Sequence, residues 1–177
     1  QTICACTVFS LSYIEARHKF RTTVTTNYPT AQLYRYPIHI DSSSFSTDTD
    51  KDDDDVFTMD IAVIPGRRRK TKATSTSTSE PLPTIFHSSG LHGVEGFVGS
   101  AIQISLLQEG VLFPKDDEHD EQDRPNIVLI HALNPIGMHQ YRRFNEHNVD
   151  LNRNCIIDIP KTTKPKTATR HEDEKDN

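Results

Sequence analysis

The sequence predicts an α/β fold, because strand and helix signals alternate between residues 84 and 133. TIFHSS at 84–89 has the β-branched and aromatic content of a strand, and 95–109 carries apolar residues at helical spacing before Gly110. NIVLIHAL at 126–133 is a continuous apolar run of the kind found in buried strands. This order forms a βαβ unit, whose two strands are expected to run parallel with a right-handed crossover.

Three elements are expected before this unit. A capping box, Ser12 followed three residues later by Glu15, predicts a helix over 11–24. YRYPIHI at 34–40 predicts a short strand that its proline confines to a sheet edge. The pattern at 56–65 predicts another strand, along which apolar residues alternate. Those alternating positions are Val56, Met59, Ile61 and Val63.

Polar segments interrupt these elements at about 41–55, 66–83 and 115–124. The Asp-rich segment 41–55 could be a calcium loop, but it lacks the glycine and terminal glutamate of an EF-hand, so a solvated insertion is expected. The segment 66–83 is basic and then Ser/Thr-rich. It could be a localisation or anion-binding patch, although an insertion between two strands is the simpler interpretation.

Composition narrows the possible partners and location. The formal net charge of −5 gives no reason to expect nucleic acid as a partner. Hydrophobic residues make up 34% of the chain and the mean hydropathy is −0.61, so part of the length is expected to lie outside a core. No apolar run of about 18 residues occurs, so no membrane span is expected. The odd, sparse set of Cys4, Cys6 and Cys155 suits a reducing compartment, which favours the cytoplasm.

The turn HGVEG follows the first strand of the βαβ unit, and NPIG follows the second. Ligands of open α/β sheets bind at this carboxyl edge, so the two turns are expected to meet on one rim. His92 and Glu95 in the first turn offer an imidazole nitrogen and a carboxylate, both of which are good zinc ligands. A lone His-x-x-Glu also occurs by chance, so a metal site and a solvated turn both remain open.

Cationic and amide side chains follow the second turn within residues 141–154. Arginine binds carboxylates through a planar fork, and asparagine adds neutral hydrogen bonds, as an enzyme that cuts next to a carboxylate needs. The alternative is that the arginines form surface ion pairs with Glu146 and Asp150. The candidates are Arg142, Arg143, Asn152 and Arg153.

HGVEG, followed by HALNPIG and then NVDLNRN, resembles the zinc carboxypeptidase superfamily, which includes a succinylglutamate desuccinylase and aspartoacylase branch. A branch of this superfamily known as a domain of unknown function is most similar to the fuller strings SGLHGVEGFVGSAIQ and HALNPIGMHQYRRFNEHNVDLNRN, and its opening resembles FSLSYIEARHKF. The resemblance covers roughly 9–20 and 84–154. It implies an α/β/α sandwich around a mixed, mostly parallel sheet, with 1–157 as the N-terminal part of the domain and 158–177 as a charged, disordered tail.

The resemblance also implies roles for individual residues. His92 and Glu95 match the first two ligands of a Zn2+ ion. Asn152 and Arg153 match the pair that holds the substrate carboxylate. The arginine that polarises the scissile carbonyl would be Arg143 or Arg142, with Arg143 favoured. The implied substrate is a small peptide or acyl-amino acid with a free carboxylate.

The family pattern continues past NVDLNRN with a third zinc ligand, a histidine, and a glutamate that acts as general base. His171 lies in a charged run and is not expected to be a ligand. His131 lies upstream on the predicted strand, where a hydrogen-bonded strand histidine is the simpler interpretation. The third ligand and the base are therefore not found, and this chain is expected to be a truncated, inactive portion.

Two classes of function remain open. The first is a zinc-dependent hydrolase of amide bonds next to a free carboxylate, either a carboxypeptidase or a deacylase of N-acyl amino acids, in the complete gene product. The second is a non-catalytic fragment that binds metal or carboxylates weakly. A strand-borne histidine and a later glutamate would distinguish the first class from the second.

Overall fold

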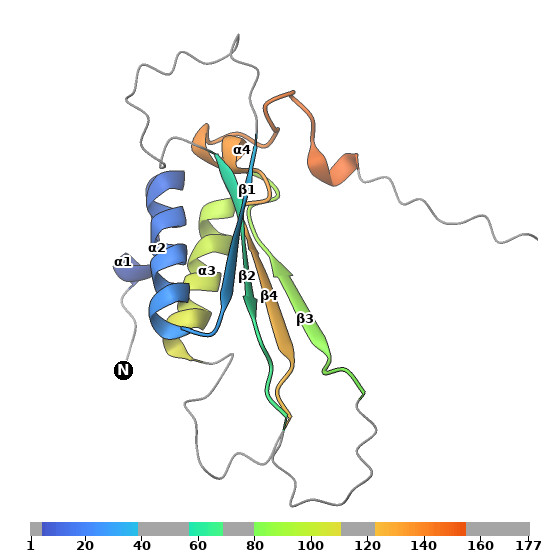
Figure 1. Ribbon diagram of the computed structural model, residues 1–177. Coiled ribbons are helices and arrows are strands. Elements are labelled where there is room, and N and C mark those ends of the chain that lie inside the picture. The colour runs from blue at the N-terminus through green and yellow to red at the C-terminus, as the bar shows by residue number, and fades with distance from the viewer. Residues whose placement is uncertain (1–4, 39–56, 69–79, 111–122, 155–177) are drawn as a thin grey trace, which may run out of the picture.

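The computed structural model describes residues 5–38, 57–68, 80–110 and 123–154, which form one open four-stranded sheet with helices (Figure 1). The α/β class expected from the sequence is confirmed. Strand order across the sheet is β1-β2-β4-β3. The elements are α1 (Ala5–Val8), α2 (Tyr13–Asn27), β1 (Gln32–Pro37), β2 (Thr58–Ile64), β3 (Thr84–Ser88), α3 (Gly96–Glu109), β4 (Asn126–His131), α4 (Pro135–His139) and the short 3-10 helix η1 (Leu151–Arg153).

The predicted βαβ unit is present as β3, α3 and β4, and its two strands pair in parallel with Thr84 opposite Asn126. The sheet as a whole is mixed, as expected, but it is not mostly parallel among the described strands. Both the β1–β2 and the β2–β4 pairs are antiparallel. Parallel neighbours need a crossover connection, and within the described ranges only the step from β3 to β4 carries a crossover helix.

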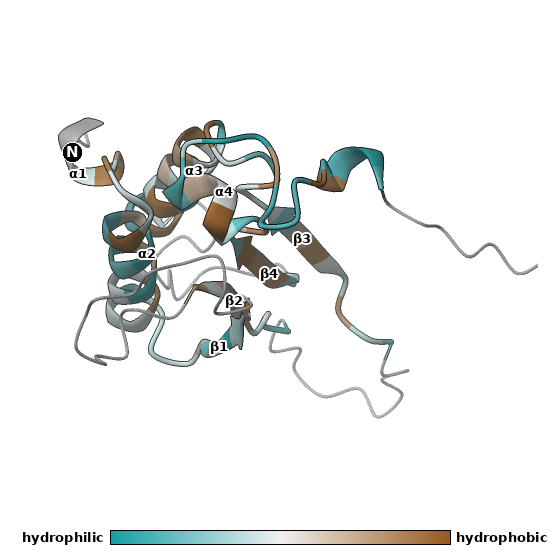
Figure 2. Ribbon diagram, turned by 90° about the horizontal axis from the view of Figure 1, so that it is seen from above, coloured by the Kyte–Doolittle hydropathy of each residue, from teal (hydrophilic) through white to brown (hydrophobic). Residues whose placement is uncertain are grey.

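Helices α2 and α3 lie side by side on one face of the sheet (Figure 1). The described residues place no helix on the opposite face, so they contain two of the three layers of the expected sandwich. Seen from above, β3 and β4 are largely hydrophobic whereas η1 is largely hydrophilic (Figure 2). The core between helices and sheet consists of Val8, Phe20, Val24, Tyr28, Ala62, Ile64, Ala101, Ile104, Leu107, Ile127 and Leu129.

The face of strand β2 that packs against the helices is not the one that carries the alternating apolar residues. Its buried positions alternate with half-buried ones, and the buried set includes Asp60 and Ala62. Met59, Ile61 and Val63 from the predicted alternating set are the half-buried positions on the other face, and Val56 lies outside the described residues. Asp60 can face inward because the Arg21 guanidinium of α2 donates to its carboxylate at 2.6 Å and 3.0 Å.

Helix α2 begins at Tyr13, directly after its Ser12 cap and two residues later than the predicted range 11–24, and it ends three residues beyond that range at Asn27. The Ser12 hydroxyl oxygen accepts the Glu15 backbone N–H at 3.1 Å. The Glu15 carboxylate accepts the Leu11 N–H at 2.9 Å, so the reciprocal bond reaches one residue further than in the usual box. The side chains that set the helical spacing, Tyr13, Ala16 and Phe20, are all fully buried.

Other local predictions are also confirmed. β1 is the expected edge strand, although it spans Gln32–Pro37 where 34–40 was predicted. Helix α3 is followed by Gly110 in the left-handed conformation, with φ 66°. None of the helices in the described ranges is long and apolar enough to cross a membrane. The insertion at 41–55, most of the insertions at 66–83 and 115–124, the tail at 158–177 and His171 lie outside the described residues.

Candidate functional site

The two polar turns meet at the carboxyl ends of β3 and β4, at the top of Figure 1, as the βαβ order predicts. The Leu133 N–H donates to the Ser89 carbonyl at 3.0 Å, and the Asn134 N–H donates to the Gly90 carbonyl at 2.8 Å. Gly90 has φ 70°, and a Cβ there would lie 2.8 Å from the Ala132 Cα. A glycine is therefore required where the HGVEG turn passes the end of β4.

The arginine segment is part of the same rim. The Gly93 N–H donates to the Arg142 carbonyl at 3.2 Å, and the Arg142 N–H donates to the Gly137 carbonyl at 2.9 Å. A Cβ on Gly93 would lie 2.0 Å from the Gly137 oxygen and 2.3 Å from the Arg142 oxygen. The HGVEG turn and the 137–142 segment, which are distant in sequence, therefore meet at a point that has no room for a side chain.

The carboxylate of Asp150 lies at the centre of the polar side chains on this rim. Its Oδ1 is 3.0 Å from His92 Nε2 and also accepts the Asn152 backbone N–H at 3.0 Å. Its Oδ2 accepts a hydrogen bond from Arg143 Nε at 2.8 Å. The Arg143 hydrogen bond, with help from His92 and Asn152, lowers the pKa of Asp150 to about 2, so this carboxylate is ionised at neutral pH.

His92 is bonded to Asp150 on one side and faces Glu95 on the other. An ionised carboxylate only accepts hydrogen bonds, so His92 Nε2 must carry the shared hydrogen. In the neutral ring the Nδ1 atom then holds the free lone pair, and it lies 3.7 Å from Glu95 Oε1. The His92 side chain is 15% exposed and that of Glu95 is 68% exposed, so the pair opens toward solvent.

The two candidate arginines have different surroundings. The Arg142 guanidinium donates to the Asn145 carbonyl at 3.1 Å and to Asn148 Oδ1 at 3.0 Å, so it stabilises the loop that follows. Arg143 forms an ion pair with Asp150, which is one of the surface pairs considered as the alternative to a substrate role. Of the two, Arg143 is the one that joins the cluster around His92.

Asn152 and Arg153 lie on η1, the orange-red turn beyond α4 in Figure 1, and both are exposed. The Asp150 side chain caps this turn through the Asn152 N–H. Within the described part of the chain, neither the Asn152 amide nor the Arg153 guanidinium makes a side-chain hydrogen bond. The structure thus connects η1 to His92 through Asp150, while the two described side chains themselves form no hydrogen bond or ion pair with His92 or Glu95.

A buried polar cluster lies under the rim, at the same end of the sheet. His131 is fully buried, is 2.9 Å from the Ser100 hydroxyl and stacks on Phe20 with ring centroids 4.5 Å apart. Burial lowers the pKa of His131 to about 4, although the nearby Asp60 acts in the opposite direction. The ring is therefore neutral, and it is the hydrogen-bonded strand histidine that the sequence favoured.

Sequence reasoning treated Asp150 only as a possible surface partner of the arginines and missed its central place. The NVDLNRN motif could have indicated a role for Asp150, because this carboxylate lies two residues before Asn152 of the candidate Asn152–Arg153 pair. No group of three or more His, Cys, Asp or Glu side chains that could hold a metal exists among the residues that the structure describes. On the rim, the candidate metal donors among these residues are the pair His92 and Glu95.

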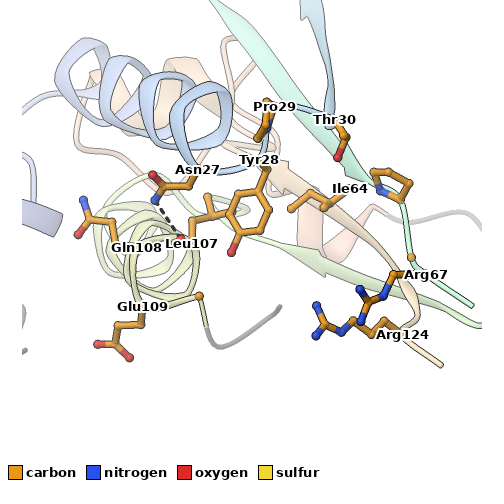
Figure 3. Close-up of a pocket in the computed structure, with 13 residues that line it drawn as sticks. Asn27, Tyr28, Pro29, Thr30, Ile64, Arg67, Leu107, Gln108, Glu109 and Arg124 are labelled. Carbon is orange, nitrogen blue, oxygen red and sulfur yellow. Dashed lines mark hydrogen bonds between the residues drawn. The ribbon is translucent and has the colours of Figure 1, made fainter. Parts of the chain in front are cut away.

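An open pocket of about 710 Å³ lies at the other end of the sheet (Figure 3). Its walls come from the last turns of α2 and α3, the end of β2 and the residues that precede β4. Arg67 and Arg124 lie close together on one wall, while Tyr28 and Leu107 form apolar lining (Figure 3). This pocket is at the amino end of β4, so it does not coincide with the cluster around Asp150.

The fold and the rim define an α/β protein whose sheet edge gathers a histidine–glutamate pair and an aspartate–arginine pair. The chain belongs to the family described as "Protein of unknown function (DUF2817)", whose model matches residues 9–174. The match includes the HGVEG turn, the NPIG turn and the NVDLNRN segment in one continuous span. No curated protein matches the chain.

Proposed function

We propose that the rim is part of the active site of a zinc-dependent hydrolase that cuts amide bonds next to a free carboxylate, as in the zinc carboxypeptidase superfamily. His92 and Glu95 are two of the metal ligands, Arg143 binds the scissile carbonyl, and Asn152 with Arg153 binds the substrate carboxylate. The substrate is a small peptide or an acyl-amino acid.

The observation that carries this proposal is the geometry of the His92–Glu95 pair. Two ligand atoms at zinc-bond lengths of about 2.0–2.2 Å in tetrahedral arrangement are separated by about 3.4 Å. The Nδ1 to Oε1 separation is 3.7 Å, and Glu95 is exposed enough to adjust by the remaining few tenths of an ångström. This separation supports the proposal that the two side chains share one zinc ion.

Asp150 supports the same assignment from the other side of the ring. Metal-binding histidines usually donate their second ring N–H to a carboxylate, which fixes the tautomer and raises the basicity of the binding nitrogen. Asp150 accepts from His92 Nε2 and so leaves Nδ1 for the metal. A solvated surface turn needs no such arrangement, so the bond to Asp150 supports the metal-site interpretation of HGVEG.

Bound zinc supplies a Lewis acid and a water of lowered pKa. The residues of this chain supply recognition and charge. Arg143 uses Nε to bond Asp150, and its terminal nitrogens make no hydrogen bond to any described residue, so they are placed to donate to a carbonyl oxygen. Arg153 and Asn152, exposed on η1, offer a fork and an amide to a carboxylate.

The second candidate is metal or carboxylate binding without hydrolysis. It is favoured by one observation, that the described residues provide two metal donors where catalytic zinc sites use three protein ligands and a water. Whether the proposed hydrolase is a peptidase or a deacylase of N-acyl amino acids depends on groups that contact the acyl side of the substrate.

The test measures zinc binding to the full chain and to two histidine variants. His92→Ala is expected to weaken zinc affinity by at least about tenfold in calorimetric titration, because a direct ligand is lost. His18→Ala, an exposed histidine of α2, is the matched control and should bind as the natural chain does. Zinc retained at full stoichiometry and affinity in His92→Ala would exclude the ligand assignment.

A further inference from the structure

Asn134 is a fully buried amide at the end of β4, and it bonds to three different parts of the rim. Its backbone N–H donates to the Gly90 carbonyl of the HGVEG side at 2.8 Å. Its side-chain Oδ1 accepts the Gly137 N–H at 2.9 Å, and its Nδ2 donates to the Arg143 carbonyl at 3.3 Å. One residue therefore joins the first turn, helix α4 and the backbone of the candidate catalytic arginine.

The simplest interpretation of Asn134 is a helix N-cap, and the Oδ1 bond to Gly137 is that cap. Asparagine, aspartate and serine cap helices about equally well, so capping alone does not require an amide. The Nδ2 group is what asparagine adds, since ionised aspartate has no donor and the single O–H of serine lies on the capping oxygen itself. In this structure that donor is used on the carbonyl of Arg143 and not within α4.

The Arg143 backbone is consequently tied to the end of β4 while its side chain reaches Asp150. Asp150 in turn bonds His92, so a chain of hydrogen bonds runs from Asn134 through Arg143 and Asp150 to the ring that faces Glu95. The neighbouring Arg142 is held by Gly93 and Gly137 through backbone bonds. Among the described residues, the side-chain bond from Asn134 is the hydrogen bond that holds the Arg143 carbonyl itself.

We propose that Asn134 is a positioning residue, which sets the place of the Arg143 guanidinium opposite the His92–Glu95 pair. The role in hydrolysis rests on the proposed function, whereas the positioning of Arg143 is independent of it. Displacement of a group by about 1 Å can cost on the order of a hundredfold in rate, so this bond matters to a reaction that uses Arg143.

The test compares Asn134→Asp with Asn126→Asp in the full chain. Asn126 lies at the opposite end of β4 and has the same pattern, because its Oδ1 accepts the Gly66 N–H at 2.9 Å and its Nδ2 lies 3.5 Å from the Thr84 hydroxyl. Asn134→Asp keeps the cap acceptor but directs a carboxylate oxygen at the Arg143 carbonyl, which repels it. Asn134→Ser is the second variant, since it caps the helix, adds no buried charge and cannot reach Arg143.

The first readout is the side-chain Nε–H resonance of Arg143 in a proton–nitrogen NMR spectrum, assigned by its loss in Arg143→Lys. Both Asn134 variants should shift it and speed its exchange with water, while Asn126→Asp leaves it in place. A folded Asn134→Ser variant with an unchanged Arg143 signal overturns the proposal.

The second readout is hydrolysis of a carboxylate-bearing substrate, in which Asn134→Ser should lower kcat by about tenfold to a hundredfold with zinc affinity retained. The loss should be absent in an Arg143→Ala background, because Asn134 acts through Arg143. An equal loss in that background overturns the positioning role. If the NMR shift is found and the natural chain hydrolyses nothing, Asn134 still positions Arg143 and it is the proposed function that fails.

Discussion

Replacing Gly93 with alanine is expected to open the rim and to cost a large part of the stability of the chain. The added Cβ would lie 2.0 Å from the Gly137 oxygen and 2.3 Å from the Arg142 oxygen, both of them backbone atoms. The segments must move apart by about 1 Å before that contact reaches the 3.0 Å below which real Cβ atoms are essentially never found. Neither carbonyl can rotate away as a side chain would.

The magnitude follows from what that movement breaks. The Gly93–Arg142 and Arg142–Gly137 backbone bonds are each worth about 1 kcal/mol net. Forcing extra volume into a packed site adds about 1–3 kcal/mol. Restricting the unfolded chain by removing a glycine returns about 0.4–1 kcal/mol. The expected net loss in the free energy of unfolding is therefore about 3 kcal/mol.

The assay is urea unfolding of the full chain, followed by circular dichroism. A loss of about 3 kcal/mol should lower the midpoint by about 1.5 M at an ordinary slope for a small domain. Gly96→Ala is the matched control, because its nearest contacts would be 3.1 Å to the Gly90 Cα and 3.2 Å to the flexible Met138 sulfur. The reasoning is refuted if Gly93→Ala unfolds within about 0.5 kcal/mol of that control.

Two further predictions concern Arg153 and His131. Arg153→Ala should raise KM for a substrate with a free carboxylate while leaving zinc affinity and the KM for its amidated analogue unchanged, and an unaltered KM for the free acid would contradict the carboxylate role. The His131 pKa of about 4 in the folded chain lies below its unfolded value of about 6.5, so the unfolded state binds more protons in this window. The free energy of unfolding should therefore fall by about 3 kcal/mol as the pH drops from 6.5 to 4. Urea titrations at several pH values should show that His131→Gln removes this fall of about 3 kcal/mol in the free energy of unfolding. An equally large fall in the variant would contradict a buried neutral ring.

Local signals in the sequence predicted the elements and the meeting of the two turns. Ser12 and Glu15 located the start of α2, and Gly110 located the end of α3, because caps depend on a few adjacent residues. The rim followed from a general property of parallel strands, whose carboxyl ends share an edge. Neither conclusion needs knowledge of distant contacts.

The parts that could not be predicted depend on contacts between distant residues. The inward face of β2 includes Asp60, whose carboxylate is paired there with Arg21, 39 residues away, and also accepts the Thr58 hydroxyl. The central place of Asp150 depends on His92, 58 residues away. An apolar alternation or a short motif records what a residue is, but it does not record which charged partner the fold brings to it.

The two carboxylate oxygens of Asp150 bind different partners, since Oδ1 is bonded to His92 and Oδ2 to Arg143. They belong to one planar group, so a substitution at position 150 removes both contacts at once. Selection on the imidazole and selection on the guanidinium therefore act on the same codon. Across relatives that retain this rim, positions 92, 143 and 150 are expected to change together or not at all, which makes the site mutationally fragile but easy to trace through sequence history.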